Sequence, residues 1–344
     1  MTLAWDIINA ATTASRRRVV PIARAGVLAR AICRRGGNGN VAAVFERSFY
    51  VCIGDEFVCI GEPAIGNGPL TLMAAARVST LALHKGQVAR VTEQRIFIGD
   101  LRFDLDGCET WCRPRWPVPA VRLDDTGAGI AHRAATESPP DSLAHALFAA
   151  NDTPLARIAR PRVAKFETWV KQSLPASCTE TQNRHPEVRP RPWAGGASKD
   201  ERPAVARAGP CILRGPRFAR PPQDDGSLVQ TVAALIGLGP GLTPSGDDFL
   251  MGALALLDAL GQTNIHAALA QAVAGAAPTL TSPLSACFLR AAAAGHVGES
   301  LHDAVASLLA GNADAAVAAA QRIGNTSGWD MLAGVAVALR IVGS

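Results

Sequence analysis

The spacing of apolar residues changes once along this chain of 344 residues, and that change limits the fold more than any other feature. Between residues 41 and 113, short runs rich in valine, isoleucine and phenylalanine alternate with turn residues, as in β-strands. From Ser227 to the C-terminus, alanine-rich stretches are interrupted by glycine or proline, as in closely packed helices. We therefore predict an α+β protein, with a β-rich N-terminal half followed by an alanine-rich helical bundle.

The β-rich region is predicted to span residues 41–125, after an N-terminal extension or first helix at residues 1–40. Residues 95–105 alternate around the pair Gly99-Asp100, which predicts a hairpin. Upstream, the segment Gly66-Asn-Gly-Pro-Leu-Thr71 leads into an apolar run. A tight turn is the simpler interpretation of this loop, and a substrate-facing role for Gly68 is the functional one.

The second half is expected to start with helices. We predict a loop at residues 124–140, a helical region at 141–175 that Pro154 and Pro161 divide, and a helical domain at 227–344.

Residues 176–222 separate these helical regions and account for the whole net charge of +5. They hold nine of the 34 basic and four of the 29 acidic residues, which leaves 25 of each sign elsewhere. They also hold 8 of the 23 prolines, and neither a helical nor a strand period survives there. The segment resembles translated genomic repeat elements, and we expect a disordered insertion whose deletion hardly changes the melting temperature. The alternative is a basic arm for an acidic partner, but with a neutral remainder we expect no nucleic-acid binding.

Composition also limits the cellular setting. No apolar run approaches the roughly 18 residues that a membrane-spanning helix needs, so no membrane association is expected. Arg16-Arg17 loosely resembles an export signal, but Arg24 and Arg30 interrupt the apolar stretch such a signal needs, and we expect a soluble, cytoplasmic protein. Only Cys108 and Cys112 lie close together among the eight cysteines, so neither a metal site nor a cofactor is expected.

Two related motifs stand out in the helical half. Ser245-Gly-Asp-Asp-Phe-Leu-Met-Gly252 and Ser327-Gly-Trp-Asp-Met-Leu-Ala-Gly334 share the pattern Ser-Gly-x-Asp-apolar-Leu-x-Gly. Each serine can cap a helix, with an aspartate three residues later completing the capping pattern. Each final glycine indicates a close approach of another backbone. We therefore predict that the two helices cross near these glycines, with both N-termini over one pocket.

Three further glycines precede the first motif, at positions 237, 239 and 241, which a simple helix cap does not require. The loop lacks the Gly-Lys-Ser/Thr of a phosphate-binding loop, and Pro240 and Pro244 exclude a dinucleotide fingerprint. Helix N-termini favour carboxylate or phosphate groups, so an anion site is expected here.

Helix capping does not explain Asp247. This residue is either a general base or a structural group. Thr281 and Ser285 lie on one face of another predicted helix start, where core packing is the simpler interpretation. The candidate catalytic residues are Asp247 and Asp248, and the candidate substrate-binding residues are Gly68, Gly239, Gly241, Thr243, Ser245, Gly246, Ser285, Thr326, Ser327 and Asp330.

The segment from Gly237 to Leu250 resembles the signature of the AllH family. The resemblance extends to Gly66–Thr71, Thr281–Leu289 and Gly324–Asp330, and residues 176–222 depart from it. It implies one subunit of oxamate carbamoyltransferase, which converts oxalurate and phosphate to oxamate and carbamoyl phosphate in allantoin breakdown. It also implies a small carboxylate- and carbamoyl-bearing substrate, phosphate, and two further kinds of carbamoyltransferase subunit as partners.

Two other functions stay open. One is a non-catalytic or regulatory subunit that binds a small acid, and the other is a ureido-acid hydrolase. No Ser-His-Asp or Cys-His arrangement is recognisable, which disfavours covalent catalysis.

Overall fold

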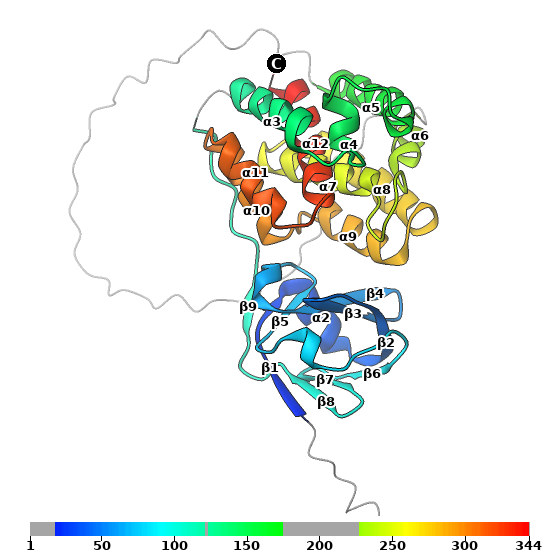
Figure 1. Cartoon of the computed structure of the whole chain (residues 1–344), viewed down its shortest axis with the longest axis vertical. Coiled ribbons are helices and arrows are strands. Elements are labelled where there is room, and N and C mark those ends of the chain that lie inside the picture. The colour runs from blue at the N-terminus through cyan, green and yellow to red at the C-terminus, as the bar shows by residue number, and fades with distance from the viewer. Residues whose placement is uncertain (1–17, 121–122, 175–226, 344) are drawn as a thin grey trace, which may run out of the picture.

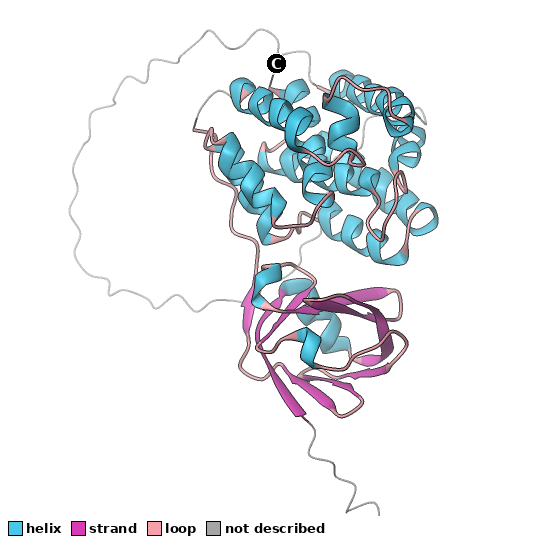
Figure 2. Cartoon of the chain, viewed as in Figure 1, coloured by secondary structure: helices cyan, strands magenta, loops and turns pink. Residues whose placement is uncertain are grey.

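The structure is a computed structural model of the chain, and it describes residues 18–120, 123–174 and 227–343. These residues form a β-barrel domain between residues 18 and 111 and a helical domain that begins at residue 124. Figures 1 and 2 show the two domains stacked end to end, with an extended segment rising from the last strand of the barrel along the helical domain. The predicted insertion at residues 176–222 lies outside the described residues.

The barrel is one nine-stranded sheet within the described residues. The strand order is β5-β4-β3-β2-β6-β7-β8-β1-β9, and an additional pairing between β1 and β5 closes the sheet. The sequence predicted the β-rich character but not this closure. The strands are β1 (Arg18–Gly26), β2 (Gly37–Val44), β3 (Ser48–Ile53), β4 (Glu56–Gly61), β5 (Thr71–Ala74), β6 (Val88–Val91), β7 (Arg95–Ile98), β8 (Leu101–Asp104) and β9 (Glu109–Trp111), with short 3-10 helices at Pro63–Ile65 and Val78–Thr80.

The predicted hairpin forms strands β7 and β8. Ile96 and Ile98 on β7 alternate with less buried residues, and so do Leu101 and Phe103 on β8, because one face of each strand lines the core. Ile98 pairs with Leu101 across a turn in which Gly99 has φ +58°. The hairpin prediction is confirmed.

Residues 18–40 of the segment predicted as an N-terminal extension or first helix are part of the barrel, and residues 1–17 lie outside the described residues. Strand β1 runs between β8 and β5 and reaches β9 at its end, and helix α2 (Val27–Arg35) follows it directly. Ala29, Ile32 and Cys33 of α2 are buried in the barrel core. The prediction failed on β1 because that strand gains its pairings from residues that lie far away in the sequence.

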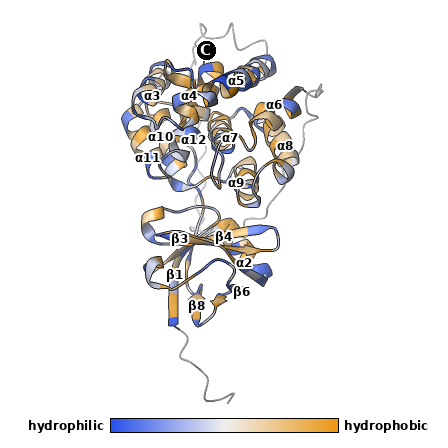
Figure 3. Ribbon diagram, turned by 45° about the vertical axis from the view of Figure 1, so that its right-hand side comes forward, coloured by the Kyte–Doolittle hydropathy of each residue, from blue (hydrophilic) through white to orange (hydrophobic). Residues whose placement is uncertain are grey.

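The helical domain is built from the second half of the chain, which confirms the mixed α+β class. Its helices are α3 (Asp124–Glu137), α4 (Leu143–Phe148), α5 (Pro154–Ser173), α6 (Ser227–Leu235), α7 (Ser245–Ala259), α8 (Thr263–Leu280), α9 (Pro283–Ala293), α10 (Glu299–Leu309), α11 (Ala313–Gln321) and α12 (Ser327–Val342). In Figure 3 the outer helices alternate between apolar and polar residues, as expected of helices with one buried face. Within the described residues, no helix combines the length and apolar character needed to cross a membrane.

Helix α3 corrects the predicted loop at residues 124–140. Gly127 and Gly129 weaken its helix propensity, which is why the sequence indicated a loop. Both glycines lie against neighbouring helices: a Cβ at Gly127 would be 2.9 Å from Leu339, and one at Gly129 would be 3.2 Å from Ala313. Tertiary packing on α12 and α11 therefore outweighs the local preference.

Helices α7 and α12 form the centre of the helical domain and cross at the two predicted glycines. A Cβ placed on Gly252 would lie 1.9 Å from the carbonyl oxygen of Met331, and one on Gly334 would lie 1.9 Å from that of Phe249. Since no side chain fits there, the backbones are in direct contact. The predicted crossing is confirmed.

Helix α9 connects the two domains. Its residues Leu284, Cys287 and Ala291 belong to the buried core of the barrel, and the rings of Phe288 and Tyr50 meet edge to face at 6.1 Å. The barrel and the helical domain therefore share a packed contact beside the cleft described next.

Candidate functional site

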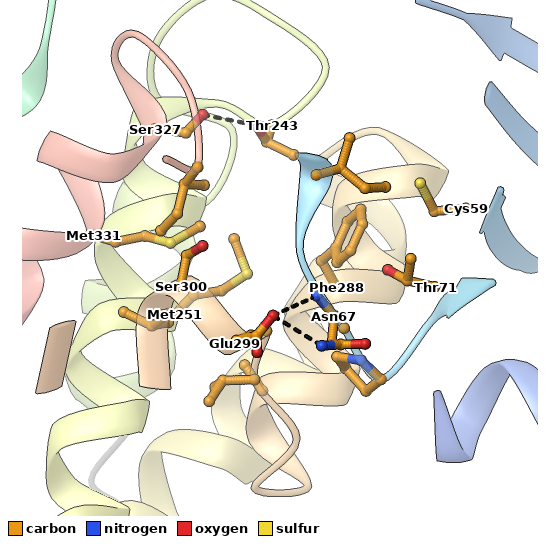
Figure 4. Close-up of a pocket in the computed structure, with 18 of the residues that line it drawn as sticks. Cys59, Asn67, Thr71, Thr243, Met251, Phe288, Glu299, Ser300, Ser327 and Met331 are labelled. Carbon is orange, nitrogen blue, oxygen red and sulfur yellow. Dashed lines mark hydrogen bonds between the residues drawn. The ribbon is translucent and has the colours of Figure 1, made fainter. Parts of the chain in front are cut away.

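A cleft with a volume of about 300 Å³ lies between the barrel and the N-terminal ends of the central helices. Figure 4 shows its polar residues coming from both sides, with Thr243 near Ser327 and Asn67 near Glu299. Its lining combines apolar side chains with hydroxyl, amide and carboxyl groups. The polar members are Ser48, Tyr50, Cys59, Asn67, Thr71, Thr243, Asp248, His296, Glu299, Ser300 and Ser327.

The two serine motifs start their helices in a different way from the prediction. Ser245 and Ser327 are the first residues of α7 and α12, and the cap positions belong to Pro244 and Thr326, neither of which makes a side-chain capping bond. The predicted serine caps are therefore wrong. The sequence spacing cannot distinguish the two positions, because the aspartate follows the serine by three residues whether the serine is the cap or the first helical residue.

Asp248 contributes a buried carboxyl group to the lining of the cleft. Its side chain is 1% exposed, and neither of its oxygens has a hydrogen-bond partner. Burial raises the pKa of the Asp248 carboxyl well above its usual range, and the nearby carboxyls of Asp330 and Asp247 add to the rise. The hydroxyls of Ser327 and Thr243 lie close without hydrogen-bond geometry and act in the opposite direction. A buried carboxyl without a partner is costly, and such groups concentrate at functional sites.

Asp247 is tied into the protein. Its Oδ1 accepts the backbone N–H of Gly237 at 2.8 Å, and its Oδ2 accepts the hydroxyls of Ser285 at 2.6 Å and of Thr281. These bonds join the start of α7 to the glycine-rich loop and to the start of α9. Asp247 and Ser285 are 0% exposed, so their contacts are those of a structural brace.

Asp330 has a comparable structural position on α12. Its Oδ1 accepts the backbone N–H groups of Leu143 at 2.6 Å and Ala144 at 3.4 Å, at the first turn of α4. Burial raises the pKa of Asp330 to about 7, although the Ser245 hydroxyl and these two amides favour its charged form. Ser245 is 4% exposed and lies at Asp330, away from the cleft lining.

The glycine-rich loop turns the chain between α6 and α7. Gly237, Gly239 and Gly241 have φ values of +74°, +105° and +102°, which other residues rarely adopt. A Cβ at Gly246 would lie 2.0 Å from the carbonyl oxygen of Leu235, so this glycine allows α7 to contact the end of α6. Their conformations account for these glycines without a ligand.

The first turn of α7 is closed to an anion by the protein itself. The amide of Gly246 donates to the carbonyl of Leu238 at 2.8 Å, and the amides of Asp247 and Asp248 donate to Pro244 at 2.9 and 3.1 Å. The start of α12 is nearer to the cleft, where the hydroxyls of Ser327 and Thr243 lie 3.4 Å apart. Thr326 is half-buried, and its backbone carbonyl accepts a hydrogen bond from the backbone N–H of Asp330.

The barrel contributes the loop after β4. Gly68 lines the cleft, and its carbonyl oxygen would lie 2.0 Å from a Cβ on Gly26, so the loop is packed tightly against β1. Next to it, Asn67 donates its backbone N–H at 2.8 Å and its side-chain amide at 2.9 Å to one carboxylate oxygen of Glu299. The Glu299 amide donates in return to the Asn67 carbonyl at 2.8 Å. These three bonds hold the barrel loop against the start of α10.

Sequence reasoning missed several of these cleft residues. Asn67 lies inside the predicted Gly66–Thr71 loop, so that loop was a usable signal. Glu299 and His296 lie in no recognisable motif, and Met251 and Met331 resemble ordinary core residues. Of the predicted site residues, the cleft brings together Gly68, Thr243, Asp248 and Ser327.

The charge of the cleft is unusual for an anion site. Its lining, as far as the structure describes it, contains neither lysine nor arginine. Burial lowers the pKa of His296, and Arg113 lowers it further against the opposing effect of Asp258, so this imidazole is neutral near pH 7. Among the residues that the structure describes, no group of three His, Cys, Asp or Glu side chains could hold a metal ion. The polar chemistry of the cleft therefore rests on hydroxyls, amides and carboxyls.

Two family models match the chain. Residues 18–110 match the AllH family N-terminal domain, and residues 235–339 match the model described as oxamate carbamoyltransferase subunit AllH. The first match coincides with the barrel, and the second covers the glycine-rich loop and helices α7 to α11 with most of α12. No solved structure matches the chain.

Proposed function

Because the chain belongs to the AllH family, we propose that it is a subunit of a carbamoyltransferase that binds a small carbamoyl-bearing acid in the cleft between its two domains. The observation that carries this proposal is the buried, unpartnered carboxyl of Asp248 in the cleft lining. A volume of about 300 Å³ is at the lower end of ligand pockets and suits a molecule as small as oxalurate.

The proposed reaction is the transfer of a carbamoyl group from oxalurate to phosphate. A phosphate oxygen attacks the carbamoyl carbon, and the bond from that carbon to the oxamate nitrogen breaks. The proton of hydrogen phosphate passes to the departing nitrogen, so the products are carbamoyl phosphate and oxamate. Of the two predicted catalytic residues, Asp248 is the one proposed to touch the substrate, since Asp247 is held by Gly237, Ser285 and Thr281.

Anion binding is assigned in this proposal to the start of α12. The hydroxyls of Ser327 and Thr243 lie there on the cleft surface, and the N-terminus of a helix carries partial positive charge. Gly68 borders the same space from the barrel side. This arrangement supports recognition of one carboxylate by neutral groups.

Phosphate requires stronger compensation of charge. Because the described lining lacks lysine and arginine, we assign the cations that would hold phosphate to another carbamoyltransferase subunit that closes the cleft. The cleft of this subunit would then be one half of a shared active site, in a hetero-oligomer.

The second candidate is a substrate-binding subunit without chemistry of its own. It is favoured by the described lining of the cleft, which contains neither lysine nor arginine to compensate the charge of phosphate.

Turnover by the reconstituted assembly tests the proposal. The chain is co-purified with its partner subunits, and carbamoyl phosphate formed from oxalurate and phosphate is measured. We expect turnover, and Asp248→Asn should reduce kcat/KM by about 100-fold or more. An exposed control, Asp125→Asn on α3, should leave the rate unchanged. An assembly that forms but does not turn over oxalurate would refute the proposed reaction. Full turnover with Asp248→Asn would instead refute the role of the cleft.

A further inference from the structure

The two serine motifs are related by an approximate local twofold symmetry. Gly252 contacts the carbonyl of Met331 and Gly334 contacts the carbonyl of Phe249, and both carbonyls belong to the fourth residue after the motif serine. Gly246 and Gly328 likewise contact the end of the preceding helix, at Leu235 of α6 and Ala320 of α11, each at 2.0 Å from an ideal Cβ. The same backbone contacts therefore occur twice, once from each helix.

The aspartates of the motifs follow the same symmetry. Asp248 lies beside Ser327 of the other motif, and Asp330 lies beside Ser245. Both side chains are 1% exposed. The two carboxyls therefore occupy equivalent positions around the helix crossing.

Their environments differ in one respect. The carboxylate of Asp330 accepts two peptide N–H groups, from Leu143 and Ala144 at the start of α4. The carboxyl of Asp248 receives no peptide N–H group, and both of its oxygens are buried without a hydrogen-bond partner in the lining of the cleft. One half of the symmetric pair is thus filled by amide donors from the protein, and the other lacks such donors and borders the cleft.

We infer that Asp248 binds the N–H groups of a carbamoyl, ureido or primary amide group of the ligand, in the place that α4 occupies at Asp330. The inference rests on the proposed function, since it takes the cleft as the substrate site. It adds the orientation of the substrate: the carbamoyl or amide end faces Asp248, and the carboxylate end points away from it.

The surroundings of Asp248 favour an amide over an anion. Asp247 and Asp330 place two more carboxyls nearby, and a ligand carboxylate at this point would add a further negative charge to a buried site. An amide presents an N–H donor beside a C=O acceptor. It therefore complements a carboxylate through N–H donors, and a protonated carboxyl through one donor and one acceptor.

Pairs of ligands that differ only in this group test the inference on the full chain. Oxamate and oxalate have the same size, but oxalate replaces the amide with a second carboxylate. Succinamate and succinate repeat the comparison without any relation to the proposed reaction. Affinities are measured by calorimetric titration at pH 7.5 for the wild type, for Asp248→Asn and for the surface control Asp125→Asn.

The inference predicts that each amide binds the wild type more tightly than its dicarboxylate. Asp248→Asn should weaken amide binding about 10-fold or more, because the ligand N–H groups then meet one acceptor oxygen and an NH2 donor in place of two carboxyl oxygens. It should strengthen dicarboxylate binding, since the introduced side-chain amide can donate to a carboxylate, and Asp125→Asn should behave as the wild type. Equal binding of oxamate and oxalate, or an unchanged preference in Asp248→Asn, would overturn the inference.

The same titrations separate this inference from the proposed function. If only succinamate binds and depends on Asp248, the amide site stands and the oxalurate reaction falls. If the assembly turns over oxalurate while neither amide is preferred, the reaction stands and the amide site falls. A variant that fails to fold is recognised by its melting temperature. In that case, the preference of the wild type for amide over dicarboxylate tests the inference.

Discussion

The contact between α7 and α12 at Gly252 is the feature that holds Asp248 at the cleft, and substitution by alanine tests it. An ideal Cβ at Gly252 lies 1.9 Å from the carbonyl oxygen, 2.7 Å from the carbonyl carbon and 3.0 Å from the Cα of Met331. All three atoms belong to the backbone of a buried helix, so no side-chain rotation can relieve the contact. The two helices would have to separate by more than about 1 Å to restore ordinary packing.

The size of the effect follows from two opposing contributions. Alanine raises helix propensity by up to about 1 kcal/mol. Overpacking a buried site costs typically about 1–3 kcal/mol, and the upper end applies here because the backbone must move. We therefore expect Gly252→Ala to lower the free energy of unfolding by about 2–3 kcal/mol, and the melting temperature by roughly 4–12 °C.

The matched control is Gly275→Ala in α8. Gly275 is exposed within its helix, and a Cβ placed on it meets no atom within 4 Å. This variant should gain about 0.5–1 kcal/mol from propensity alone. Thermal unfolding followed by circular dichroism compares the two proteins. A Gly252→Ala variant as stable as Gly275→Ala would show that α7 and α12 are not in backbone contact.

Three further variants test individual contacts. Asp248→Asn should be more stable than the wild type at pH 7 without ligand, because burial raises the folded-state pKa of Asp248. The wild type therefore loses stability as the pH rises above about 4. The difference in the free energy of unfolding, measured with urea, should vanish toward pH 4. A pH-independent difference would contradict this. Asp247→Ala should lower the free energy of unfolding by about 2–4 kcal/mol in the same assay, because the Gly237 amide and the Ser285 hydroxyl lose their acceptor. A loss below about 0.5 kcal/mol would refute the structural role of Asp247. Glu299→Ala should weaken oxamate binding severalfold, because it releases Asn67, whereas Glu299→Gln retains an acceptor oxygen and should bind oxamate nearly as the wild type does. Equal effects of the two substitutions in titration would argue against a contribution of the Asn67–Glu299 hydrogen bonds to ligand binding.

Local features of the sequence predicted much of the fold. The alternation around Gly99 predicted the hairpin, because strand burial follows a period of two. The glycines at positions 252 and 334 predicted the helix crossing, because a glycine inside a helix is unfavourable unless something requires it. Both signals work because the residue itself carries the constraint.

The roles of the two neighbouring aspartates could not be predicted in this way. The spacing from Ser245 assigned Asp248 to a cap and left Asp247 for chemistry. In the structure α7 begins at Ser245 itself, Asp247 points to Ser285 and Thr281, and Asp248 lines the cleft. Adjacent helical residues point in directions about 100° apart, and the tertiary packing around α7 decides which of the two aspartates meets the cleft.

The barrel side of the cleft was also beyond local reasoning. Asn67 and Glu299 are separated by 232 residues, and their contact exists only because the barrel is placed against α10. Closure of the barrel depends in the same way on the pairing of β1 with β5, for which neither strand carries a local signal.

The structure of a complex with oxalurate tests the central claim most directly. We predict that a crystal structure of the full chain with oxalurate places the ligand in the cleft, with its ureido nitrogens within hydrogen-bond distance, about 2.7–3.2 Å, of the Asp248 carboxyl. The ligand carboxylate should lie farther from Asp248 than the ureido nitrogens do. A ligand bound elsewhere, or one whose carboxylate faces Asp248, would contradict the account.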